Sequence, residues 1–451
     1  MDNSPGYLVS FFGALKAGAA VVPLNVQLVP RELKYLLSDS VPRAVISLER
    51  HRKTVESAVA EAGITTAVVV IDGSLQPAAC ALQPEACSLP PEACSLNPAA
   101  CSLKPAACDL AVILYTSGTT GKPKGVMLTH DNFDANSDSI IQYLKLTSDD
   151  SIMVVLPFFY SYGLSLLTTH IKVGGTLVID NRFLYPNTIL DTMQREGVTG
   201  FAGVPSHYAI LLRKSALRNY KLPALRYVTQ AGGAMSPAMI KEFIDLLPDI
   251  RFYVMYGQTE ATARLSYLDP VYINDKMGSI GKAIPGVELA VLNEAGLKVK
   301  PGEIGEITAK GRNIMSGYWN SPAETDFVLK NGILYTGDLA RVDEDGFLYV
   351  VSRKKDMIKS GANRISPFEI EDVVCQLKGV LECAAVGVPD EILGEAIRLC
   401  VVRTEDAVIL DQDILAFCKQ NLAVYKMPKQ IVILGSLPKT SSGKIKREEL
   451  K

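Results

Sequence analysis

Short apolar runs alternate with helix-like stretches through the middle of the chain. The runs between residues 151 and 257 read "SIMVVLPF", "TLVI", "GFAGVP", "LRYVTQAGG" and "RFYVMYG". Each has the length of a strand, and most are followed by a stretch with helical periodicity. Strands joined in this way by crossover helices form parallel sheets. The pattern therefore predicts an α/β fold for this region.

The first 75 residues also alternate helical and strand patterns. "YLVSFFGALKAG" predicts an amphipathic helix that ends near Gly18, and "AAVVPL" after it predicts a buried strand. A signal peptide is the competing interpretation, but Asp2 precedes the run and Lys16 interrupts it. Further on, "RELKYLLSDS" predicts a helix and "RAVISL" a strand.

The pattern changes twice after residue 286. Residues 287–351 contain short alternating strands between glycine-rich turns, which predict a small antiparallel barrel or sheet. The segment "SRKKDMIKSGANRIS" is dense in charge and glycine, and a compact α+β pattern follows it. We expect a large domain over 1–353 and a smaller one over 354–451.

Residues 75–109 form a heptapeptide repeat that includes five of the nine cysteines. A proline in every unit argues against a coiled coil, and the even spacing lacks the paired cysteines of a zinc site. We interpret the repeat as a low-complexity insertion without a function of its own. The other cysteines are scattered, which predicts a reducing, cytoplasmic location.

The overall charge excludes some classes of partner. Lys plus Arg number 46 against 48 for Asp plus Glu, a formal net charge of −2. This balance gives no electrostatic reason to expect nucleic acid or an anionic membrane as the main partner. No apolar run reaches the roughly 18 residues that a transmembrane helix needs.

The stretch "YTSGTTGKPKGV", residues 115–126, is the first candidate for chemistry. Three glycines, several hydroxyls and two lysines suit a loop that holds an anion with its backbone amides. The Walker A pattern fails, because Gly118 and Gly121 stand too close together and Pro123 follows Lys122.

This loop resembles the phosphate loop of the acyl-adenylate-forming enzymes, which include acyl-CoA synthetases, peptide-synthetase adenylation domains and firefly luciferase. Further matches occur in the family's order: "QAGGA" (230–234), "YGQTE" (256–260), "GYWN" (317–320), "YTGD" (335–338), "SRKKDMIKSGANRISPFEIE" (352–371) and "PKTSSGKIKR" (438–447). The resemblance covers almost the whole chain and is closest in type to bacterial long-chain fatty acid–CoA ligases.

The resemblance implies a reaction in two steps. The enzyme would use ATP and Mg²⁺ to convert a carboxylic acid to acyl-AMP with release of pyrophosphate, and would then pass the acyl group to the thiol of coenzyme A. It also implies a large N-terminal domain of doubly wound sheets with a small β-barrel, and a mobile C-terminal domain on a hinge.

The same resemblance implies roles for individual residues. Catalysis would rest on Lys444, Glu260 and Thr259, with Glu260 as the magnesium ligand. The ATP phosphates would be held by Thr116, Ser117, Gly118, Thr119, Thr120, Gly121 and Lys124. Adenine and ribose would contact Gly232, Gly233, Ala234, Tyr256, Gly257, Asp338 and Arg353. Lys355 would be the hinge, and Lys359, Ser360 and Gly361 would serve the thiol step.

The expected acyl pocket is lined by Tyr160, Ser206, Gln230, Ala231, Gln258 and Ala263. Tyr160 stands where acyl- and aryl-CoA synthetases commonly have histidine, and Ala362 replaces a common glycine in the thiol-step loop. In the family this sequence resembles, amino-acid-activating members have an aspartate just after this "FF". No acid follows Phe158 and Phe159 here, so the resemblance argues against an amino-acid substrate. A fatty acid is the first expectation and an aromatic acid the second.

Three alternatives stay open at this point. The acceptor could be an acyl carrier protein, the enzyme could be an aryl-CoA ligase, or the chain could be an inactive nucleotide-binding remnant. The last is suggested by the repeat and by an N-terminus that is shorter than the family's, as if truncated.

Overall fold

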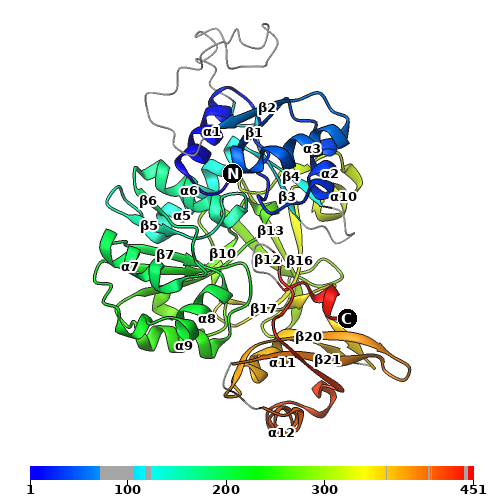
Figure 1. The fold of residues 1–451 in the computed structure, drawn as a ribbon. Coiled ribbons are helices and arrows are strands. Elements are labelled where there is room, and N and C mark those ends of the chain that lie inside the picture. Colours follow the sequence, from blue (N-terminus) through cyan, green and yellow to red (C-terminus); the bar gives the residue numbers. More distant parts are fainter. Residues whose placement is uncertain (72–105, 117–122, 362, 405–406, 408, 441–444) are drawn as a thin grey trace.

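The computed structural model describes residues 1–71, 106–116, 123–361, 363–404, 407, 409–440 and 445–451. Figure 1 shows the elements in sequence colours, with the C-terminal β20, β21, α11 and α12 at the opposite end of the molecule from α1, α2 and α3. The heptapeptide repeat lies outside the described residues except for its last positions, 106–109.

The largest sheet contains all five strands predicted between 151 and 257. It has seven strands in the order β11-β10-β9-β8-β7-β5-β6, and β5 to β9 are mutually parallel as expected. The strands are β5 (Ser151–Val154), β6 (Thr176–Ile179), β7 (Gly200–Gly203), β8 (Tyr227–Gln230), β9 (Arg251–Tyr256), β10 (Ser266–Leu268) and β11 (Lys282–Ala283). The helices of this region are α5 (His130–Leu144), α6 (Ser161–Val173), α7 (Pro186–Glu196), α8 (Pro205–Lys214) and α9 (Pro237–Leu246).

Alternate residues of these strands belong to two different cores. On β9, Tyr253 and Met255 join one hydrophobic cluster, whereas Phe252 and Val254 join another. Successive side chains of a strand point to opposite faces, so the sheet is covered by apolar packing on both sides. This explains why its strands read as continuous apolar runs.

Two smaller sheets precede or flank this one. β1 (Ala44–Leu48) pairs in parallel with β2 (Ala67–Ile71), next to α2 (Pro30–Ser40) and α3 (Arg52–Ala62). β3 (Leu110–Thr116) and β4 (Lys124–Thr129) form an antiparallel hairpin, to which β14 (Gly317–Tyr318) adds a third strand.

The predicted N-terminal helix is present, but the strand after it is not. The helix is α1 (Pro5–Lys16), and the hydroxyl of Ser4 caps it by accepting from the Tyr7 amide at 3.2 Å. The expected strand "AAVVPL" is reduced to one isolated bridge between Val21 and Val112. Among the described residues, no helix is both long and apolar enough to span a membrane.

The region from 287 to 353 forms a five-stranded antiparallel sheet. Its order is β12-β13-β16-β15, and β17 pairs with β16. The strands are β12 (Val287–Leu292), β13 (Ile304–Gly311), β15 (Leu329–Lys330), β16 (Ile333–Val342) and β17 (Leu348–Arg353), and the helix α10 (Pro322–Val328) precedes β15.

The C-terminal region has its own sheet and its own core. The elements are β18 (Ile358–Ser360), β19 (Asn363–Ile365), α11 (Pro367–Val374), β20 (Val380–Asp390), β21 (Gly394–Arg403), α12 (Asp411–Asn421) and β22 (Gln430–Leu434). Ile370, Leu399 and Ile414 are fully buried in one apolar cluster. The predicted α+β pattern is therefore present, whereas the boundary at 353/354 stays a prediction.

Gly281 offers a test of how β17 is joined to the edge of the large sheet. Its φ is +77°, and a Cβ there would lie 1.8 Å from the Tyr267 carbonyl oxygen. We expect Gly281→Ala to lower the free energy of unfolding by at least about 3 kcal/mol, since overpacking adds to the strain of a left-handed residue. Gly286→Ala is the control, because its φ is +78° and nothing lies within 4 Å of its added methyl. Urea denaturation should show a much smaller loss for this control, of about 1–2 kcal/mol. Equal losses would contradict the close approach at Gly281.

Candidate active site

The predicted phosphate loop connects the two strands of the β3–β4 hairpin. Thr116 ends β3 and lies opposite Lys124, the first residue of β4. Ser117, Gly118, Thr119, Thr120 and Gly121 lie outside the described residues, so their roles stay predictions. The described ends of the loop, Thr116 and Lys124, lie opposite each other in the hairpin.

Lys124 already has an anionic partner within the chain. Its ammonium group forms an ion pair with Glu324 of α10, and it lies 5.2 Å from the centre of the Tyr318 ring. The Lys124 side chain is only 12% exposed. Its role as a phosphate ligand stays a prediction, because a phosphate at Lys124 would have to compete with Glu324. Sequence patterns gave no signal for this pair, whose members are 200 residues apart.

Tyr318 connects Lys124 to the predicted magnesium ligand. Its hydroxyl donates to Glu260 Oε1 at 2.9 Å, while its ring faces Lys124. Burial and the charge of Glu260 raise the Tyr318 pKa well above its usual range, so the hydroxyl keeps its proton. Tyr318 belongs to the motif "GYWN", which by itself assigns it no role. The structure shows that it positions the carboxylate.

Glu260 suits a site in which Mg²⁺ takes most of its ligands from the ATP phosphates and from water. It lies in the short helix η6 (Thr259–Ala261), and its own carbonyl accepts from the Met315 amide at 2.9 Å. No cluster of three or more His, Cys, Asp or Glu suited to a metal occurs among the described residues. Mg²⁺ commonly uses one or two carboxylates together with phosphates and water. A single carboxylate is therefore compatible with the predicted role.

Three of the predicted nucleotide-binding residues meet at one carboxylate. Asp338 of β16 is 4% exposed, and Tyr256 at the end of β9 donates its hydroxyl to Asp338 Oδ2 at 2.7 Å. Arg353 of β17 lies opposite Asp338, with Nε 3.1 Å from Oδ1. The charge of Asp338 raises the Arg353 pKa, and burial raises that of Tyr256. The carboxylate is thereby held in one orientation by a donor on each oxygen.

A side-chain hydrogen bond within the segment holds the glycine-rich turn after β8. Gly232 has a φ of +85°, a value that favours glycine, and Gln230 donates its side-chain amide to the Gly233 carbonyl at 2.7 Å. Gln230 is 1% exposed. It was predicted as a wall of the acyl pocket, and the structure adds that it holds the turn predicted to contact adenine. Ala234 continues this turn.

Gly257 has a packing reason of its own. A Cβ at this position would lie 2.0 Å from the Ala263 carbonyl oxygen. Glycine is therefore required by the close approach of the backbone at Ala263. Ala263 and Ala231 are both 3% exposed. The predicted nucleotide contact of Gly257 stays a prediction.

The predicted acyl-pocket residues come from the ends of neighbouring elements. Tyr160 precedes α6, Gln230 ends β8, and Gln258 follows β9. Ser206 lies in the first turn of α8, and Ala263 follows η6. Thr259 is predicted to touch the α-phosphate. Its hydroxyl oxygen lies 3.5 Å from that of Ser161, so the start of α6 lies next to the segment that follows β9. These ends form one edge, where parallel α/β sheets bind their ligands.

His207 lies near this edge but is a poor candidate for a base. Burial lowers its pKa to about 4, and its ring packs 4.2 Å from that of Phe183. It is therefore neutral at pH 7. A role as a wall or packing residue fits these contacts better than a catalytic one.

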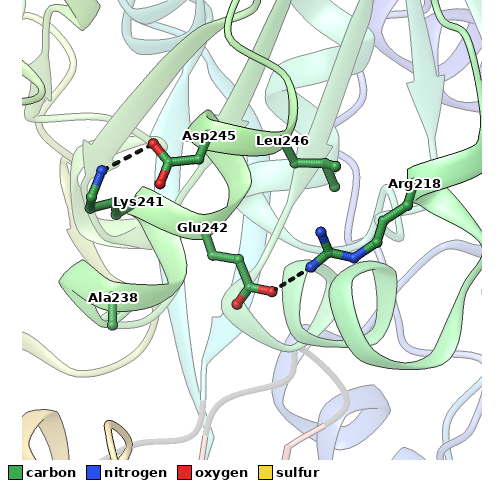
Figure 2. Close-up of a pocket in the computed structure, with 6 residues that line it drawn as sticks. All are labelled: Arg218, Ala238, Lys241, Glu242, Asp245 and Leu246. Atoms are coloured by element: carbon green, nitrogen blue, oxygen red, sulfur yellow. Dashed lines mark hydrogen bonds and ion pairs between the residues drawn. The ribbon is translucent and has the colours of Figure 1, made fainter.

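The pocket in Figure 2 lies away from these residues. It is lined by Arg218, Ala238, Lys241, Glu242, Asp245 and Leu246 of α9 and its surroundings. Lys241 pairs with Asp245, and Arg218 pairs with Glu242. Its charges satisfy one another, and it contains none of the predicted site residues.

The predicted hinge and thiol-step loop follow β17. Lys355 lies in an exposed turn between β17 and β18. Lys359 and Ser360 end β18, and the Gly361 amide donates to the Leu393 carbonyl at 2.8 Å. Ala362 and the predicted catalytic Lys444 lie outside the described residues. Arg447, three positions after Lys444, pairs with Glu371 of α11 and so fixes the end of that segment.

The chain matches the AMP-binding enzyme family over residues 1–319 and the C-terminal domain of AMP-binding enzymes over 369–444. A feruloyl-CoA synthase of Amycolatopsis is 35% identical, covering 100% of this chain and 87% of the relative. A long-chain-fatty-acid–CoA ligase of Salmonella typhimurium is also 35% identical, covering 100% and 84%. The chain therefore belongs to the AMP-binding enzyme family.

Solved structures agree with this family. ATP-bound MatB from Rhodopseudomonas palustris superposes with a TM-score of 0.87 at 31% identity, over 99% of this chain and 86% of that one. The o-succinylbenzoate coenzyme A synthetase of Bacillus subtilis, in complex with ATP and magnesium, gives 0.82 at 28% identity, over 100% and 87%. The predicted family, fold class and enzyme class are confirmed.

The hydrogen bond from Tyr256 to Asp338 should be measurable without any substrate. Tyr256→Phe removes a donor from a buried carboxylate, and we expect it to lower the free energy of unfolding by about 1–3 kcal/mol. Tyr253→Phe on the same strand is the control, because no hydrogen bond of its hydroxyl is seen among the described residues. Chemical denaturation should show a change within about 0.5 kcal/mol for this control. Identical losses would mean that the hydroxyl does not stabilise Asp338.

Proposed function

We propose that this chain activates a carboxylic acid with ATP to form acyl-AMP and pyrophosphate, and then transfers the acyl group to the thiol of coenzyme A. The observation that carries the proposal is the buried carboxylate of Asp338. It joins three segments that family resemblance assigns to the nucleotide, and the two oxygens of a carboxylate can accept from two ribose hydroxyls.

Formation of acyl-AMP needs separate residues for the nucleotide, the metal ion and the phosphate charge. Asp338 and Arg353 would hold the ribose, while the turn at Gly232 and Gly233 would approach the adenine. Glu260 would hold Mg²⁺, which when bound neutralises phosphate charge. The acid and ATP are both anionic, so their reaction requires cations near the α-phosphate. We assign that role to Lys444.

Lys124 would serve the polyphosphate after exchanging its partner. In the described structure its charge is neutralised by Glu324. Several phosphate oxygens offer more negative charge than one half-exposed carboxylate, so ATP can compete for the ammonium. The pair keeps Lys124 oriented toward Tyr318 and Glu260 before ATP arrives.

The two named relatives support two different classes of acid as the substrate. The long-chain-fatty-acid–CoA ligase supports the first expectation, a fatty acid. The feruloyl-CoA synthase supports an aromatic acid, and both relatives are 35% identical to this chain. Both names specify coenzyme A as the acceptor, which is why we propose it over an acyl carrier protein.

Pyrophosphate release with a panel of carboxylic acids tests the proposal. We expect release that depends on ATP, Mg²⁺ and a suitable acid, and thioester only when coenzyme A is added. Binding of ATP without turnover for any acid would identify an inactive remnant instead. Turnover that needs an acyl carrier protein would identify the carrier-dependent alternative.

Lys444→Ala should separate the two steps. A cation placed where charge develops is worth about 10²–10³ in rate, so formation of acyl-AMP should fall by that factor while preformed acyl-AMP is still converted to thioester. Lys446→Ala is the control, since Lys446 forms an exposed ion pair with Glu449. Isotope exchange between pyrophosphate and ATP measures the first step. Normal exchange in Lys444→Ala would remove this residue from the mechanism.

Lys355→Pro tests the proposed hinge. Proline fixes φ near −65°, so a rotation of the C-terminal domain about this residue would be hindered. We expect thioester formation to be lost while acyl-AMP still forms, measured by single-turnover assays of each step. Lys354→Pro is unsuitable as a control, because the Lys354 amide donates to the Gly337 carbonyl at 2.9 Å. Lys355→Ala serves instead, and should retain both steps. Parallel loss of both steps in Lys355→Pro would speak against a hinge at this position.

A further inference from the structure

Helix α2 has two faces with different partners. Leu33 and Leu37 are buried in an apolar cluster that α2 shares with α3. Tyr35 and Asp39 lie four positions apart, so they share another face of the same helix. Both form hydrogen bonds with the β3–β4 hairpin, and Figure 1 shows α2 beside this hairpin. One face therefore anchors the helix, and the other contacts the strands that carry the predicted phosphate loop.

This second face holds both ends of the predicted phosphate loop. Tyr115, which directly precedes the first threonine of the loop, donates its hydroxyl to Asp39 Oδ2 at 2.5 Å. At the other end, Tyr35 donates its hydroxyl to the carbonyl of Pro123 at 3.2 Å, just before the lysine that begins β4. Because the two contacts are one helical turn apart, a single element sets the positions of both ends.

The backbone of Asp39 adds a contact to the segment that positions the predicted magnesium ligand. Trp319 Nε1 and Asn320 Nδ2 donate to the Asp39 carbonyl at 3.0 and 3.2 Å. This carbonyl lies in the last turn of α2, where carbonyl groups have no partner within the helix. Trp319 follows Tyr318, whose hydroxyl donates to Glu260 at 2.9 Å. The end of α2 thus joins the hairpin to the strand that orients Glu260.

The hydrogen bond between Tyr115 and Asp39 is suited to fixing a position. An O–H donor and a carboxylate acceptor form short hydrogen bonds, and the separation of 2.5 Å is of that kind. Burial and the Asp39 carboxylate raise the Tyr115 pKa well above its usual range. The hydroxyl therefore keeps its proton at neutral pH and remains a donor.

We propose that Tyr35 and Asp39 are positioning residues for the reaction with ATP, because they fix the span between the two ends of the phosphate loop. The inference rests on the proposed function and adds to it two residues that lie outside every family motif. Neither would touch the reacting atoms, so both act through the loop ends that they hold. Thr116 and Lys124 would then meet the polyphosphate at a separation that is already set before ATP binds.

Asp39→Ala and Tyr35→Phe test the two contacts separately. We expect each to lower kcat/KM for ATP in pyrophosphate–ATP exchange by at least about tenfold, since small displacements of binding groups have large effects on rate. Calorimetry should show weaker binding of ATP with Mg²⁺. Conversion of preformed acyl-AMP to thioester should stay within about twofold of the wild-type rate, because pyrophosphate has left before this step.

Two further variants separate positioning from general stabilisation. Asp39→Asn keeps an oxygen that can accept from Tyr115, so it should recover most of the exchange rate that Asp39→Ala loses. Tyr115→Phe combined with Asp39→Ala should be no slower than Asp39→Ala alone, because both changes remove the same hydrogen bond. Tyr220→Phe is the matched control. The Tyr220 hydroxyl donates to Asp191 at 2.7 Å on an exposed surface outside the predicted site, and its loss should leave both steps unchanged.

The outcomes distinguish this inference from the proposed function. Thermal unfolding is measured for every variant, and Tyr35→Phe with Tyr115→Phe decides the matter if Asp39→Ala does not fold. Unchanged ATP kinetics in Tyr35→Phe or Asp39→Ala, or an equal loss in both steps, would overturn the inference alone. No pyrophosphate release by the wild-type chain with any acid would overturn the proposed function, and calorimetric binding of ATP would then still test the two contacts.

Discussion

The buried carboxylate of Asp338 is the contact on which the candidate active site depends. Its two oxygens connect the end of β9 in the parallel sheet, through Tyr256, with Arg353 at the end of β17 in the antiparallel sheet. Arg353 is also the last residue before the turn proposed as the hinge. A single carboxylate thus joins two sheets and the start of the C-terminal region, with a donor on each of its oxygens.

The site balances its charges before any substrate binds. Lys124 is paired with Glu324, Glu260 accepts from Tyr318, and Asp338 faces Arg353. Each group is therefore oriented, yet each has a partner that a nucleotide, a metal ion or a phosphate could replace or share. Arg264 is different, since its described partners are neutral.

The sequence predicts well what is encoded locally. The five parallel strands, α1 and the order of the family segments follow from runs and motifs within about a dozen residues, and the structure contains them. The pairing of Lys124 with Glu324 could not be predicted, because it joins residues 200 positions apart that no motif connects. No sequence pattern singles out Arg264, and its burial is seen only in the structure. The prediction of a strand over "AAVVPL" was wrong because strand formation depends on pairing with a distant segment. Here the pairing is limited to one bridge, between Val21 and Val112.

The most direct measurement is a crystal structure of the chain with Mg²⁺ and a non-hydrolysable ATP analogue. We expect both ribose hydroxyls within hydrogen-bonding distance of the Asp338 carboxylate, the metal on Glu260, and the polyphosphate between Thr116 and Lys124. A nucleotide bound elsewhere, with Asp338 contacting only Tyr256 and Arg353, would contradict it.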